Sequence, residues 1–130
     1  MSVTRLRLAR RYVTVVEVDP FPATAAGVGL TEDEREAITT YVANSPEVGE
    51  VVPGTGGLRK LRWPGKGGGK RGGYRVVYYF FNESNPVYLL AIYKKSQQID
   101  LTAEGKKRLI KLAGILKASA RARGSRRVVR

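Results

Sequence analysis

The sequence predicts an α+β fold, and three observations support this prediction. Short segments rich in β-branched and aromatic residues alternate or run together, as strands do. Longer segments with apolar residues at helical spacing lie before and after the main group of strands. The 130 residues are enough for one domain with one core. We therefore expect a small, mostly antiparallel sheet with the N-terminal helix or helices packed on one face, and a C-terminal helix.

Four segments have the composition of strands. Residues 12–19 alternate and are followed by two prolines that end the strand. In residues 58–63, the period of a strand puts Lys60 and Arg62 on one face and Leu61 and Trp63 on the other. Residues 74–81 and 87–93 are almost continuously apolar, which is typical of central strands, and residues 82–86 join them as a hairpin.

Two segments have helix signals. Thr31 and Glu34 form a capping box, so we expect a helix from this point to about Asn44. A short helical turn is expected between this helix and Pro53. The second helix is expected over residues 103–116. Its inward-facing residues are predicted to be Leu109, Ile110, Leu112 and Ile115.

The chain divides into one domain and two basic ends. We expect a basic N-terminal extension over residues 1–11, one domain over residues 12–117, and a basic, flexible tail over residues 118–130. No apolar run approaches the ~18 residues of a membrane span. The N-terminus has no uninterrupted apolar core of a secretory signal, so the expected location is the cytoplasm.

The charge balance favours a polyanionic partner. The chain has 24 Lys and Arg against 11 Asp and Glu, which gives a net charge of +13. Acidic residues gather in the first half, and residues 51–82 contain bases without a single acid. These bases are Arg59, Lys60, Arg62, Lys66, Lys70, Arg71 and Arg75.

The absence of histidine and cysteine restricts the chemistry. Thiolate nucleophiles, disulfides and the commonest zinc ligands are excluded, and so is the usual general base at neutral pH. We expect no cofactor and no metal. The glycine-rich loop after Trp63 lacks the G-K-[ST] ending of a phosphate-binding loop, which excludes an NTPase of that type.

Three sequence blocks carry a family resemblance. PGTGGLRKLRW at residues 53–63 is followed by GKRGGYRVVYYF at residues 69–80, and then by VYLLAIYKKSQQIDLT at residues 87–102 and a helix that begins AEGKKRLIKL. In this order and spacing, the blocks resemble the HigB-like branch of the RelE/ParE toxin superfamily over about residues 12–116. The resemblance implies the compact RelE fold and endoribonucleolytic cleavage of mRNA, in most relatives on the translating ribosome, in its A site on the 30S subunit. It also implies a cognate antitoxin, which we expect to be a HigA-like helix-turn-helix protein.

RNA can be cleaved without a metal if its own 2′-hydroxyl attacks the neighbouring phosphate. Crowded cations lower the pKa of a lysine, and arginines hold phosphate oxygens in a fork. Our hypothesis is that Lys60 is the base, that Arg62 and Arg75 hold the phosphate, and that Lys95 protonates or stabilises the leaving group. The resemblance supports these positions, because relatives carry basic residues at the corresponding places. Further RNA contacts are predicted at Arg59, Lys66, Lys70, Arg71, Tyr93 and Lys94, with Tyr93 as a surface on which a base can stack.

Two other functions fit part of the same pattern. A ParE-like relative would poison a DNA gyrase by protein contact, which does not need a phosphate-cleaving cluster. A non-catalytic ribosome- or RNA-binding protein would explain the positive charge equally well through counterion release. Only the placement of the basic residues, above all Lys60, Arg62, Arg75 and Lys95, distinguishes a nuclease from such a binding protein.

Overall fold

A five-stranded sheet in the order β1-β5-β4-β3-β2 forms the centre of the protein. The computed structural model describes residues 13–65, 73–95 and 102–129. The strands are β1 (Val15–Glu17), β2 (Glu50–Val51), β3 (Leu58–Trp63), β4 (Tyr74–Tyr79) and β5 (Val87–Lys94). The helices are α2 (Phe21–Gly27), α3 (Glu32–Asn44) and α4 (Ala103–Val129). Among the described strands, only β1 pairs in parallel, with β5, so the predicted mostly antiparallel α+β fold is confirmed.

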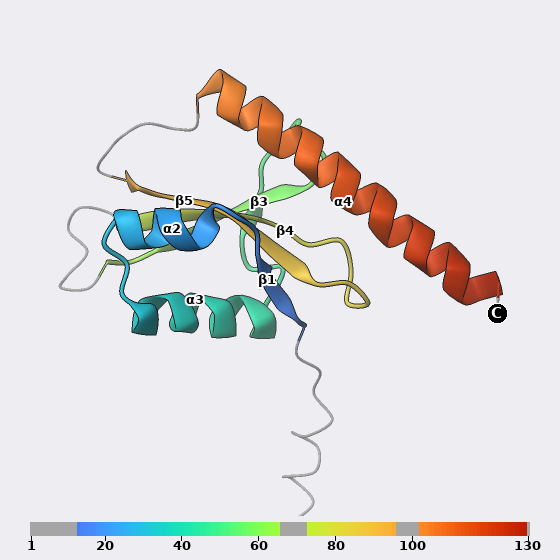
Figure 1. The fold of residues 1–130 in the computed structure, drawn as a ribbon, viewed down its shortest axis with the longest axis horizontal. Helices are drawn as coiled ribbons and strands as arrows, with labels where there is room; N and C mark the ends of the chain where they lie inside the picture. Colours follow the sequence, from blue (N-terminus) through green and yellow to red (C-terminus); the bar gives the residue numbers. More distant parts are fainter. Residues whose placement is uncertain (1–12, 66–72, 96–101, 130) are drawn as a thin grey trace, which may run out of the picture.

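Helices cover both faces of the sheet (Figure 1). Helices α2 and α3 lie on one face, where a core forms around Phe21, Ile38 and Tyr78. Helix α4 crosses the other face and packs Ala113 against a second core around Val77 and Tyr79. We call these the α2/α3 face and the α4 face. The two cores explain why β4 and β5 are apolar on both sides, since strands buried on both faces lose the alternating pattern.

The central strands follow the sequence prediction closely, with one irregularity. Tyr78 of β4 pairs with Leu89 of β5, but Val77 pairs with Ala91, so Leu90 is an extra residue in β5. This bulge places Leu90 and Ala91 on the same face, where both contact the α4 core. The alternation resumes after it, so that Ile92 lies on the α2/α3 face and Tyr93 on the α4 face.

Helix α3 begins and ends where the sequence predicts. The Thr31 hydroxyl accepts the Glu34 backbone N–H at 3.1 Å, and the Glu34 carboxylate accepts the Thr31 N–H at 3.0 Å. Helix α2 was not predicted, because the prolines around Phe21 suggested only the end of a strand. Pro22 instead lies in the first turn of α2, where its missing N–H has no partner to lose.

Four expectations are corrected. The first strand is shorter than residues 12–19. Before Pro53, the chain forms a single hydrogen-bonded turn at residues 46–47 instead of a short helix, and β2 follows this turn. The C-terminal helix does not end near Leu116: residues 118–129, expected as a tail, continue α4. Ile115 is 58% exposed, and the buried residue in this part of α4 is Ala113, which is 1% exposed. The expected N-terminal extension lies outside the described residues.

The capping box gives a first stability prediction. Thr31→Ala removes the acceptor for the Glu34 N–H and should lower the free energy of unfolding by about 1 kcal/mol. Thr40→Ala is the matched control, because Thr40 is exposed within the same helix and alanine is a better helix former there. Urea denaturation of the three proteins checks this, and equal midpoints for Thr31→Ala and wild type would refute it.

Candidate active site

Basic side chains form a row on the α4 face. Arg62 of β3 pairs with Arg75 of β4, and Arg75 pairs with Tyr93 of β5, so these three residues lie side by side across the sheet. Lys60 lies two residues before Arg62 and therefore points to the same face. The pairing of adjacent strands thus brings together three of the four cations predicted for catalysis.

A hollow of about 460 Å³ collects these cations. It is lined by Lys60, Arg62 and Arg75, together with Leu61, Val48 and Glu50. Arg62 is exposed and the other two cations are half-buried, so all three charges can be reached from solvent. The hollow lies at the N-terminal end of β2, because Glu50, the first residue of β2, pairs with Lys60 and β2 does not extend beside Arg62. A strand of two residues gives no periodic signal, so the sequence did not show that Glu50 lies in this site.

A second, smaller cavity of about 80 Å³ lies between the sheet and the start of α4. It is lined by Lys60 and Tyr93 from the sheet, Lys106 from α4, and a wall of Val52, Thr55, Leu58 and Val77. Lys60 borders both cavities. The sequence did not predict that Lys106 belongs to this site, because Lys60 and Lys106 are far apart in the sequence and only the tertiary fold brings them to one cavity.

The other predicted site residues do not line the hollow. Arg59 points to the α2/α3 side, where its guanidinium donates to the carbonyl oxygens of Glu47 at 3.0 Å and Gly49 at 2.7 Å. Lys94 pairs with Tyr74, which belongs to the α2/α3 core, so the structure does not bring Lys94 to the basic row. Lys95 follows β5 and is exposed, and its N–H donates to the Gly73 carbonyl. Lys66, Lys70 and Arg71 lie outside the described residues.

The buried phenol of Tyr78 holds the segment that leads into β2. Its hydroxyl donates to the Pro46 carbonyl and accepts the Gly49 N–H, both at 2.8 Å. A Cβ on Gly49 would lie 2.9 Å from the Tyr78 ring, so only glycine fits against the phenol. Burial raises the pKa of Tyr78, although the Gly49 hydrogen bond opposes this. Tyr78 thereby holds the backbone of residues 46–49, which directly precede Glu50.

Tyr78→Phe should lower the free energy of unfolding by about 1–3 kcal/mol, because it leaves the buried Gly49 N–H without its acceptor. The pH dependence gives a second readout. Since the folded pKa of Tyr78 is raised, its contribution is full below the unfolded value of about 10 and falls as pH rises above it. Wild type should therefore lose more stability between about pH 8 and pH 11 than Tyr78→Phe does. Equal losses in urea titrations would contradict the role of the phenol.

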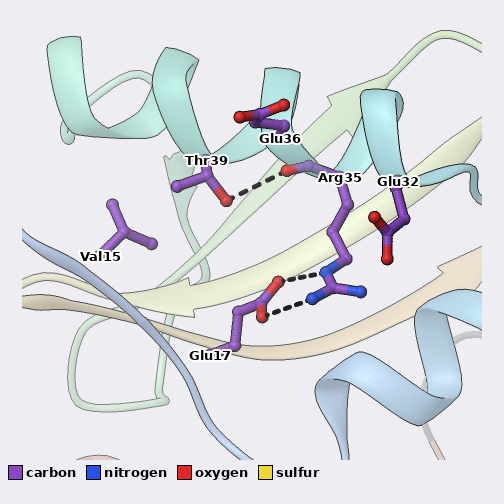
Figure 2. Close-up of a pocket in the computed structure, with 6 residues that line it drawn as sticks. All are labelled: Val15, Glu17, Glu32, Arg35, Glu36 and Thr39. Carbon is purple, nitrogen blue, oxygen red and sulfur yellow. Dashed lines mark hydrogen bonds and ion pairs between the residues drawn. The ribbon is translucent and has the colours of Figure 1, made fainter.

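An acidic hollow of about 350 Å³ lies between β1 and α3 (Figure 2). Glu17 of β1 accepts two hydrogen bonds from Arg35 of α3, at 2.7 and 3.2 Å, and this pairing raises the pKa of Arg35. Glu32 and Glu36 border the same hollow. The ion pair between Glu17 and Arg35 tethers α3 to the edge of the sheet. Because three carboxylates face one guanidinium here, the hollow repels a polyanion and is unsuited to bind nucleic acid.

Two features are absent from the part of the chain that the structure describes. No group of three or more acidic side chains there is placed to hold a metal ion. No helix in that part of the chain is long and apolar enough to cross a membrane.

Comparison with known proteins bears on the fold. No family model matches the sequence. A solved structure of the E. coli toxin RelE, a double arginine-to-alanine mutant in the free state, superposes with a TM-score of 0.50. The superposition covers 67% of this chain and 87% of that chain, with 17% sequence identity. The fold resembles that of RelE. The predicted RelE-like fold is therefore confirmed, and its sheet carries the basic row on the face crossed by α4.

Proposed function

We propose that the protein is the toxin of a type II toxin–antitoxin module, of the HigB kind, and that it cleaves mRNA in the ribosomal A site. One observation carries the proposal: Lys60, Arg62 and Arg75 line a single hollow on the sheet of a RelE-like fold. A non-catalytic RNA-binding surface needs only a spread of positive charge. Cations converging on one hollow of this size instead suit a single phosphate group whose charge grows during a reaction.

The proposed reaction uses the RNA 2′-hydroxyl as nucleophile and needs no metal. Arg62 and Arg75 are neighbours across β3 and β4, so their guanidinium groups can hold the non-bridging phosphate oxygens from two directions. Lys60 adds a third positive charge to the pentavalent phosphorane. Lys95 protonates or stabilises the 5′-oxygen, and Tyr93 offers a stacking surface beside Arg75.

The proposal includes a cytoplasmic location and an antitoxin partner. A HigA-like helix-turn-helix protein would neutralise the toxin by presenting acidic and apolar residues to the basic row. The positive charge of the residues around the hollow provides the complementary surface. Charge reversal at Arg62, which is exposed, would then weaken the complex.

Induced expression with mapping of mRNA 5′ ends by primer extension tests the function. We expect growth arrest with in-frame cuts in translated messages. Arrest with intact mRNA and inhibited DNA supercoiling would support a gyrase poison. Binding to ribosomes without mRNA fragments, from protein that is folded by circular dichroism, would show a non-catalytic binding protein.

A further inference from the structure

A carboxylate lies inside the basic site. Glu50 of β2 pairs with Lys60 of β3, and paired residues on adjacent strands share a face of the sheet. Glu50 also lines the 460 Å³ hollow together with Lys60, Arg62 and Arg75. The register and the shared hollow therefore agree that Glu50 belongs to the same site as the cations.

The Glu50 side chain is not used to support the fold. It is exposed, and among residues 13–65, 73–95 and 102–129 it forms no ion pair within 4.0 Å and no side-chain hydrogen bond. A carboxylate beside a phosphate site weakens phosphate binding by repulsion. An unpaired carboxylate at this position is therefore unfavourable for binding alone, and it suits a step in which a proton must be accepted.

We propose that Glu50 is the general base of the reaction described under the proposed function, on which this inference rests. The Glu50 carboxylate takes the proton of the 2′-hydroxyl as O2′ forms a bond to phosphorus. The bond from phosphorus to O5′ breaks, and O5′ receives a proton from a cationic donor, for which Lys95 is the candidate. The products are a 2′,3′-cyclic phosphate and a 5′-hydroxyl, and Glu50 then returns its proton to solvent. Lys60 stays charged and stabilises the phosphorane.

The chemistry favours a glutamate over a lysine for this step. A glutamate is ionised at neutral pH and is ready to accept a proton, whereas a lysine is protonated there unless its surroundings lower its pKa. Among the described residues, the charged groups that line the hollow beside Glu50 are Lys60 and Arg62 from β3 and Arg75 from β4, and all three are cationic. Lys106 of α4 adds a fourth cation in the adjoining cavity, which Lys60 also lines. Their positive charges compensate the repulsion between the Glu50 carboxylate and the phosphate of the substrate.

Cleavage of a short mRNA on purified ribosomes by Glu50→Gln tests the proposal. We expect kcat to fall about 10²–10⁴-fold, as for loss of a general base. Affinity for the same RNA with a 2′-deoxy group at the cut site should be unchanged or higher, because a negative charge has been removed. The wild-type rate should fall in acid as a carboxylate becomes protonated, and this acid limb should be absent from the residual activity of the variant.

Glu47→Gln is the matched control, since Glu47 is exposed and does not line the hollow. It should cleave like wild type. Cleavage by Glu50→Gln at the wild-type rate would overturn the proposal and restore Lys60 as the base. So would a wild-type rate that keeps rising up to alkaline pH, as expected for a lysine base. A wild-type protein that never cleaves mRNA on ribosomes would refute the proposed function itself, and the two failures are therefore distinguishable.

Discussion

Arg75→Ala should reduce the rate of RNA cleavage by about 10²–10³-fold, the usual cost of removing one group that stabilises charge in the transition state. Arg75 lies at the middle of the basic row, between Arg62 on β3 and Tyr93 on β5. It is half-buried on the sheet and lines the same hollow as Lys60 and Arg62. Single-turnover cleavage of a short RNA, or cleavage of mRNA on purified ribosomes, measures the loss.

Two further variants distinguish the bidentate geometry of the Arg75 guanidinium from its positive charge as the cause of the rate loss. Arg75→Lys keeps the positive charge but removes the bidentate geometry, so its rate should lie between those of wild type and Arg75→Ala. Arg121→Ala removes an exposed arginine from α4 outside the hollow and should cleave normally. Thermal melts must show that Arg75→Ala remains folded. Near-normal cleavage by the folded Arg75→Ala protein would remove Arg75 from the site.

Phe21→Ala should lower the free energy of unfolding by about 3–5 kcal/mol, the typical cost of emptying a fully buried phenylalanine site. Phe21 begins α2, has no exposed surface, and belongs to the core under β4 and β5. The loss is a large part of the stability of a small domain, so the variant should unfold at a much lower temperature. Calorimetry or urea titration measures the change.

Phe21→Leu provides the comparison for this substitution. It keeps an apolar side chain of similar volume and should cost clearly less than Phe21→Ala. Because Phe21 lies on the α2/α3 face and the basic row on the α4 face, the folded fraction of Phe21→Ala should retain its rate of RNA cleavage. A variant that is as stable as wild type would show that α2 is not part of the core.

The sequence predicted the elements that have strong local signals. Helix α3 was found from its capping box, and β3, β4 and β5 from their composition. Alternation in β3 placed Lys60 and Arg62 on one face, and the β3–β4 pairing then puts Arg75 beside Arg62. This neighbourhood depends only on local periodicity and on antiparallel pairing of adjacent strands.

The sequence could not predict features that depend on tertiary contacts. Strand β2 consists of two residues and is defined by its pairing with β3, so Glu50 gave no signal. The Leu90 bulge changes the faces of β5, and strict alternation from Val87 would have placed Tyr93 with Val87 on the α2/α3 face. The far half of α4 is stabilised by contacts such as the Arg123 hydrogen bond to Asn85, 2.7 Å long, which no local pattern reveals.

The fit of Gly49 against Tyr78 makes the two positions epistatic. Alanine at position 49 would place its Cβ 2.9 Å from the Tyr78 ring and hydroxyl and 3.1 Å from the Lys60 carbonyl. A smaller residue at position 78 would relieve the first contact while removing the hydroxyl that bonds both Pro46 and Gly49. Substitutions accepted at either position during evolution therefore depend on the residue at the other position. Because Gly49 directly precedes Glu50, this dependence also affects the placement of the Glu50 carboxylate in the hollow.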